Sequence, residues 1–165
     1  MMTDFTKTRA AFHLPDGMTY LDGNSLGPMP RAAADRVATM MADEWSEMLI
    51  TGWNRAGWYV QPRKVGDRIA RLIGAGDGQV VMGDTLSIKV FQALSAALAL
   101  RPDRRVILSD SGNFPSDLYV AEGIARALDA TLRVVSPEEV EAAIGPDLAV
   151  LMLTEVDYRT GRRHD

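Results

Sequence analysis

Apolar residues in the first part of the chain recur with helical spacing. They stand every three or four positions over residues 30–52 and again over residues 63–74, which predicts two amphipathic helices joined by an aromatic loop. A glycine closes the second of these segments, as is common at helix ends. The segment before them is rich in turn residues and holds one short apolar stretch, 18–21, for which we expect a strand.

From residue 79 onward, short apolar runs alternate with longer segments of helical spacing. The expected strands are residues 80–82, 105–109, 132–135 and 148–153, and the expected helices are residues 86–100, 115–128 and 137–144. Strands separated by helices in this way are typical of a parallel sheet covered on both faces. The sequence therefore predicts an α/β fold, with candidate chemistry in the loops after the carboxyl ends of its strands.

The composition of the chain argues against several classes of protein. The 165 residues are 47% hydrophobic and 24% charged, as in a globular chain with a packed core, and the net charge of -4 argues against a nucleic-acid partner. The lack of cysteine rules out disulfides and thiolate metal sites, and it favours the cytoplasm. The uncharged run 90–100 is too short to cross a bilayer, and the amino terminus lacks the apolar stretch of a signal peptide, so we expect no membrane association. Two isolated histidines argue against a metal site.

Hydroxyl groups stand at the start of the helix 86–100. Thr85 and Ser87 lie where the first amides of that helix point outward with the positive end of its dipole, which is a favourable place for a phosphate group. The alternative is that Asp84 or Thr85 is an ordinary helix cap.

The loop after the strand 105–109 carries an aromatic ring and a carboxylate. Phe114 is placed to stack on a planar heterocycle, and Asp117 is placed to face a protonated ring nitrogen. In the alternative interpretation, Phe114 packs on its own helix and Asp117 is a first-turn acid favoured by the helix dipole.

Three other segments are ambiguous taken singly. Thr154 adds a hydroxyl group at the same sheet edge but is also an ordinary end for a strand. Asn24 and Ser25 are common turn residues, and Trp53 and Trp58 suit a core or a subunit interface as well as a ligand site. No lysine is placed to form a Schiff base.

Four motifs together resemble kynureninase, a family of pyridoxal-phosphate (PLP) enzymes with the aspartate aminotransferase fold, fold type I. They are YLDGNSLGP at residues 20–28, DTLS at 84–87, NFPSD at 113–117 and YRTG at 158–161. The resemblance covers essentially the whole chain. The NSLG turn and the FPSD loop together are not expected in the desulfurases and aminotransferases of the same fold.

The resemblance implies a cofactor site for PLP. The residues it assigns to this site are Leu86, Ser87, Phe114, Pro115, Ser116, Asp117 and Thr154. Leu86 and Ser87 would bind the phosphate, Phe114 would stack on the pyridine ring, Asp117 would lie near the ring nitrogen and Thr154 would complete the cradle. On the substrate side the resemblance implies Asn24 and Ser25, with Trp53 beside them or in the neighbouring subunit of a homodimer.

The implied activity is hydrolysis of L-kynurenine to anthranilate and L-alanine in tryptophan catabolism. The 3-hydroxy form of kynurenine, which would give 3-hydroxyanthranilate, is the alternative substrate. No catalytic residue is assigned here, because the Schiff-base lysine belongs to family segments that follow Asp165. We therefore expect the chain to be an amino-terminal fragment that forms an incomplete three-layer sandwich with a mostly parallel sheet. Residues 1–60 would form an arm and a helix, and residues 61–165 the first part of the PLP-binding domain. We expect this fragment alone to bind PLP weakly or not at all and to hydrolyse no kynurenine.

Three alternatives stay open at this point. One is another PLP enzyme of fold type I, such as a desulfurase or an aminotransferase. Another is a nucleotide-binding α/β domain, although the glycine-rich segment 74–78 follows a helix, the reverse of the order in a dinucleotide loop. The last is a remnant without catalytic activity.

Overall fold

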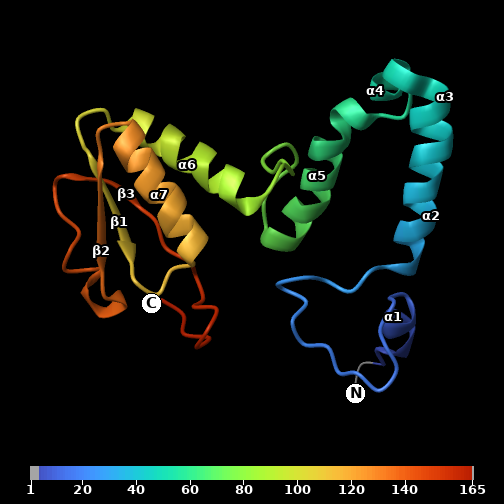
Figure 1. The fold of residues 1–165 in the computed structure, drawn as a ribbon, viewed down its shortest axis with the longest axis horizontal. Coiled ribbons are helices and arrows are strands. Elements are labelled where there is room, and N and C mark those ends of the chain that lie inside the picture. Colours follow the sequence, from blue (N-terminus) through green and yellow to red (C-terminus); the bar gives the residue numbers. More distant parts are fainter. Residues whose placement is uncertain (1–3, 165) are drawn as a thin grey trace. The chain divides into compact units, whose positions relative to one another are not determined.

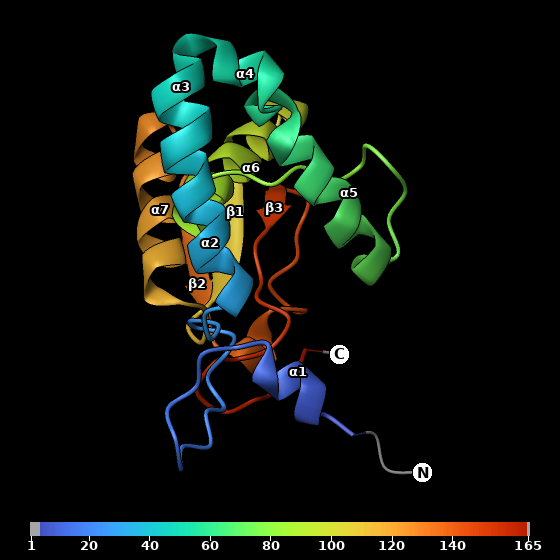
Figure 2. The same ribbon diagram turned by 90° about the vertical axis from the view of Figure 1, so that its right-hand side faces the viewer.

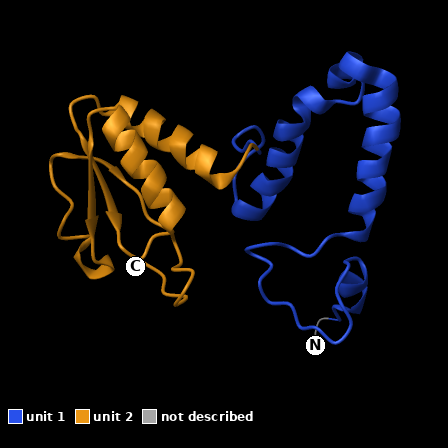
Figure 3. Ribbon diagram, in the orientation of Figure 1, with its two compact units in different colours: residues 1–82 blue, residues 83–165 orange. Residues whose placement is uncertain are grey.

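A computed structural model of the chain, drawn in Figure 1, describes residues 4–164. The chain forms two compact units, residues 1–82 (unit 1) and residues 83–165 (unit 2), which Figure 3 shows in separate colours. Each unit is described by itself.

Unit 1 is helical. Its elements are α1 (Thr6–Ala10), α2 (Arg31–Thr39), a π-helical segment (Met40–Trp45), α3 (Ser46–Met48), a 3-10 turn (Leu49–Thr51), α4 (Gly52–Arg55), a second 3-10 turn (Trp58–Val60) and α5 (Gln61–Ile73). The expected helix 30–52 is thus confirmed as one run of helical turns that a π-helical segment interrupts. The helix α5 is confirmed as well, and Gly74 ends it with a φ of 74°, a left-handed conformation that glycine adopts without strain.

Two expected strands of unit 1 are wrong. Residues 18–21 form no strand; the hydroxyl of Tyr20 instead donates to the carbonyl of Leu26, 2.7 Å away, within a compact turn. Residues 80–82 are not paired with a strand either, and the amide of Met82 donates to the carbonyl of Pro62 on α5 at 3.1 Å. An apolar run becomes a strand only where another strand supplies its hydrogen bonds.

Unit 2 alternates helices and strands as expected. Its elements are α6 (Leu86–Leu100), β1 (Val106–Asp110), α7 (Pro115–Ala127), β2 (Thr131–Val135), a 3-10 turn (Pro137–Glu139) and β3 (Leu148–Leu151). The expected helix 137–144 is wrong beyond its first turn. Ser136 and Glu139 form a capping box at the start of the segment, but so short a segment gains too few hydrogen bonds to offset helix nucleation.

The three strands form a parallel sheet in the order β2-β1-β3. Residues 106–110 of β1 pair in register with residues 131–135 of β2, and β3 pairs along the other side of β1 with an irregularity between Val106 and Ile107. A parallel sheet was expected, and it is confirmed.

The core of unit 2 lies between the sheet and two helices. Its buried residues come from α6, β1 and α7. They are Leu94, Leu98, Ile107, Ala121, Ile124 and Ala125. Because residues of both helices belong to one buried cluster with Ile107, the helices cover the same face of the sheet, as the view in Figure 2 also shows. The helical layer expected on the other face does not form within residues 83–164. None of the helices in residues 4–164 combines the length and apolar character needed to cross a bilayer.

Candidate functional site

The candidate site lies at the carboxyl ends of β1 and β3. The chain passes from β1 to β2 on one side and returns to β3 on the other side of β1, so the direction of strand order reverses between β1 and β3. In open α/β sheets, ligands bind at such a reversal, beyond the carboxyl ends of the strands. Polar residues are buried there: Ser109 and Asp110 end β1, and Asn113 lies in the loop that follows.

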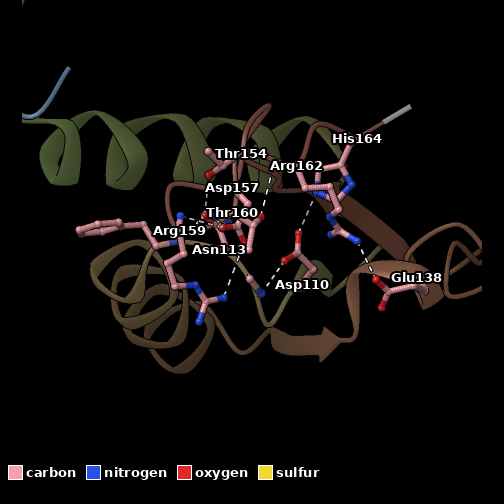
Figure 4. Close-up of polar contacts among 11 residues, drawn as sticks. Asp110, Asn113, Glu138, Thr154, Asp157, Arg159, Thr160, Arg162 and His164 are labelled. Carbon is pink, nitrogen blue, oxygen red and sulfur yellow. Dashed lines mark hydrogen bonds and ion pairs between the residues drawn. The ribbon is translucent and has the colours of Figure 1, made fainter. Parts of the chain in front are cut away.

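Asn113 joins the two loops. Its side-chain oxygen accepts a hydrogen bond from the amide of Phe114 at 2.7 Å and another from the hydroxyl of Thr154 at 2.6 Å (Figure 4). Its side-chain nitrogen donates to the hydroxyl of Ser109 at 3.0 Å. One buried amide therefore holds together the end of β1, the loop after it and the loop after β3.

The aromatic ring and the carboxylate expected in the loop after β1 are both present. Phe114 precedes Pro115 at the start of α7, and its ring is 45% exposed and packs edge-to-face on Tyr158 with 4.9 Å between ring centroids. Asp117 is buried in the first turn of α7, where the hydroxyl of Ser116 donates to its carboxylate at 3.3 Å. The exposed ring is free to contact a planar molecule, and the carboxylate stands one helical turn away from it.

Leu86 and Ser87 lie in a different environment. Leu86 is largely exposed at the start of α6, and Ser87 lines a hollow of about 400 Å³ between α6 and α7. Thr85 is the cap of α6, accepting a hydrogen bond from the amide of Ile88 at 3.4 Å, so the ordinary capping role of Thr85 is confirmed. Within residues 83–164, the structure joins Phe114 and Thr154 through Asn113 but brings neither Leu86 nor Ser87 into hydrogen-bond contact with them.

The segment after β3 folds into a tight hairpin, residues 155–164. Val156 and Arg163 form an antiparallel bridge across it. The amides of Thr160 and Arg159 donate to the carboxylate of Asp157 at 2.9 Å and 2.8 Å, and these bonds hold the pKa of Asp157 below its usual range. The YRTG motif is therefore the turn of a hairpin that lies beside the loop of Asn113.

The residues expected on the substrate side all lie in unit 1. Asn24 and Ser25 are exposed in a turn, where the hydroxyl of Ser25 donates to the carboxylate of Asp22 at 2.8 Å. Trp53 is half exposed and packs edge-to-face on Trp58, with 6.4 Å between ring centroids. The hydrogen bond of Ser25 and the ring contact of Trp53 are thus both formed between residues of unit 1.

An apolar cavity of about 610 Å³ lies beside the two tryptophans. Its lining residues are Met40, Trp45, Trp53, Trp58, Gln61, Pro62 and Met82. The π-helical segment places Glu44 against the indole of Trp58, whose nitrogen donates to the carboxylate at 2.7 Å, and Arg36 pairs with the same carboxylate at 2.9 Å. Within residues 4–164, no cluster of three or more histidine and acidic side chains is placed to hold a metal ion.

The stability of unit 1 should decrease in acid because of Glu44. The hydrogen bond from Trp58, and then the charge of Arg36, hold the pKa of Glu44 below its usual range. A lowered pKa means that the carboxylate stabilises the fold above its unfolded pKa and that this contribution is lost as the pH falls through the folded pKa. The midpoint of thermal unfolding should therefore fall as the pH drops below about 4.3, the ordinary glutamate pKa.

Trp58→Phe tests this prediction, because it removes the main cause of the lowered pKa. Thermal unfolding measured from about pH 7 to about pH 3 should show a smaller acid-induced drop for Trp58→Phe than for the wild type. Trp53→Phe is the matched control, since Trp53 belongs to the same aromatic pair. An unchanged pH dependence in Trp58→Phe would show that the hydrogen bond from Trp58 to Glu44 contributes nothing to it.

Thr154→Val should destabilise unit 2 by about 1 kcal/mol, the usual net contribution of one hydrogen bond. The substitution keeps the shape of the side chain but removes the donor to Asn113, whose oxygen then keeps only the amide of Phe114. Urea unfolding is the measurement. Thr131→Val, at an exposed position of β2, should change the stability by less than about 0.5 kcal/mol. Equal effects at the two positions would argue against a role for the bond to Asn113.

Sequence reasoning missed the roles of three residues. Asn113 belongs to the NFPSD motif without a role of its own, Asp110 has no assigned role, and His164 counts only as one of the two isolated histidines. The signal available was the pair of polar residues that ends the otherwise apolar strand β1. Nothing in the sequence indicated that His164 lies 3.1 Å from the carboxylate of Asp110.

Searches among known proteins identify similar chains. The chain is 52% identical over 164 residues to a kynureninase of Pseudomonas fluorescens and 49% identical over 164 residues to kynureninases of Burkholderia pseudomallei (strain 1106a) and Burkholderia mallei (strain SAVP1). Each alignment covers 95% of this chain and 39% of the relative, so the chain spans about two fifths of the length of the curated relatives it matches. No protein-family model matches the chain. The resemblance to kynureninase indicated by the sequence motifs is confirmed.

Proposed function

We propose that this chain is the amino-terminal part of a kynureninase, and that the complete protein uses PLP to hydrolyse L-kynurenine to anthranilate and L-alanine. The observation that supports this most strongly is identity of about half of all residues along nearly the whole chain with proteins of that name. The arrangement of Asn113, Phe114 and Thr154 at the strand-order reversal is consistent with a cofactor site.

The residues at the sheet edge fit the chemistry of PLP. Phe114 offers an exposed aromatic face to a pyridine ring, and Asp117 offers a buried carboxylate to its nitrogen. A nearby negative charge favours the protonated form of a ring nitrogen. When bound, PLP supplies an electron sink for the bonds broken at the substrate, while the protein binds and orients.

Other residues of the chain would support this binding. Thr154 and Asn113 would fix the rim of the site through their 2.6 Å hydrogen bond, with Pro115 and Ser116 setting the first turn of α7. Leu86 and Ser87 would meet the phosphate at the amino terminus of α6, where the helix dipole favours an anion. This requires the start of α6 to approach the loop of Phe114 in the complete protein.

Substrate contacts and assembly are part of the same proposal. Asn24, Ser25 and Trp53 would line the substrate end of the site, within one subunit or across a homodimer. Residues 1–60 would form the arm and helix, and residues 61–165 the first part of the PLP-binding domain of fold type I. The absence of cysteine is consistent with the reducing cytoplasm.

Kynurenine turnover tests the proposal. The product of the complete reading frame should release anthranilate from L-kynurenine when PLP is supplied, and anthranilate fluorescence is the readout. The 165-residue chain alone should release none, because the proposed family places the lysine that binds the cofactor in a later segment. Consumption of cysteine instead of kynurenine by the complete protein would favour a desulfurase and overturn the proposal.

A further inference from the structure

Asp110 and His164 form a contact that the proposed cofactor residues do not include. The imidazole Nε2 of His164 lies 3.1 Å from Oδ2 of Asp110, and both side chains are labelled in Figure 4. The side chain of Asp110 is only 4% exposed and that of His164 is 24% exposed. The other carboxylate oxygen of Asp110 accepts the amide of Gly112 at 2.6 Å.

The loop between the two carboxylates is tightly packed. A β-carbon at Gly112 would lie 2.9 Å from Oδ1 of Asp110 and 3.0 Å from Oδ2 of Asp157. Both distances are shorter than ordinary van der Waals contact, so the backbone of this loop is held between two acidic side chains. The position of Asn113, the next residue, depends on that packing.

Each acidic side chain near this loop has its own partner. Asp157 accepts the amides of Arg159 and Thr160 within the hairpin turn. Arg162 pairs with the exposed Glu138 at 2.7 Å. His164 is the side chain that bonds Asp110, and this bond joins the end of β1 directly to the end of the hairpin.

We propose that Asp110 and His164 are a positioning pair for the cofactor site. Their bond holds the hairpin 155–164 against the loop after β1. This fixes Asn113, whose oxygen sets the amide of Phe114 and the hydroxyl of Thr154. Neither Asp110 nor His164 touches the cofactor. The inference rests on the proposed function, because it assigns the pair a role in binding PLP.

The test is made in the complete protein with three variants. His164→Phe keeps a planar ring but removes both nitrogens, whereas His164→Gln keeps an amide nitrogen that can donate to Asp110. Arg162→Gln is the control, since it breaks an exposed ion pair of the same hairpin without touching Asp110. Each protein is freed of cofactor and titrated with PLP, and the dissociation constant and the circular dichroism of the bound cofactor are measured.

We expect His164→Phe to raise the dissociation constant of PLP about tenfold, the effect of losing one hydrogen bond to a charged group. The circular dichroism of the bound cofactor should also change, because the ring of Phe114 is no longer held in place. His164→Gln should stay within about threefold of the wild type, and Arg162→Gln within about twofold. A merely structural pair would lower the unfolding temperature of His164→Phe without changing the cofactor signal.

The outcomes separate this inference from the proposed function. If the wild-type protein binds no PLP, the proposed function fails and the inference fails with it. If the wild type binds PLP and His164→Phe binds it within twofold, only the positioning role is overturned. Should His164→Phe not fold, His164→Ala replaces it in the same titration, and there too a change within twofold overturns the inference.

Discussion

Ile107→Ala is expected to lower the free energy of unfolding of unit 2 by about 4 kcal/mol. Ile107 is fully buried in β1, the middle strand of the sheet, and belongs to the core cluster with Leu94 of α6 and Ile124 of α7. Truncation removes apolar contacts and leaves a cavity that flanking strands and helices cannot readily fill. Urea unfolding followed by circular dichroism measures the loss.

Ile144→Ala is the matched control for this prediction. It makes the same chemical change in unit 2 at a side chain that is 51% exposed. We expect it to cost less than about 1 kcal/mol. If the two substitutions cost the same, Ile107 would not be at the centre of a packed core, and the sheet order β2-β1-β3 would be in doubt.

Gly66→Ala should destabilise unit 1 by about 2 kcal/mol, although alanine favours a helix over glycine by about 1 kcal/mol. Gly66 is buried inside α5, and a β-carbon there would overlap the carbonyl oxygen of Val80. Because the clashing atom belongs to the backbone, the segment 80–82 must move away from α5. The expected loss of stability is therefore the cost of forcing an extra methyl group into a packed core.

Gly123→Ala provides the control with the opposite sign. Gly123 also lies inside a helix, α7, but a β-carbon there would have no neighbour within 4 Å. This substitution should stabilise unit 2 by up to about 1 kcal/mol. Thermal unfolding of both variants is the measurement, and stabilisation by Gly66→Ala would contradict the close approach of residues 80–82 to α5.

Local signals explain why the elements of unit 2 could be predicted from the sequence. Thr85 caps α6, Pro115 begins α7, and the strands of unit 2 are short apolar runs. Each of these signals acts within a few residues of the element it defines. The same locality explains the capping box that Ser136 and Glu139 form.

Contacts between distant residues explain what could not be predicted. A strand at residues 80–82 would need a partner strand, and no local pattern states whether one is present. The bond between Thr154 and Asn113 spans 41 residues and that between His164 and Asp110 spans 54. The sequence predicted polar groups in the loops after β1 and β3 at one sheet edge, but not which side chains join these two loops.

The most direct test of the proposed cofactor site is an experimental structure of the complete protein with PLP bound. We expect the pyridine ring to stack on Phe114, with about 4.5 to 7 Å between ring centroids, and its nitrogen to face the carboxylate of Asp117. The phosphate should lie at the amino terminus of α6, beside Ser87. A coenzyme bound away from Phe114 and Asp117 would contradict the account.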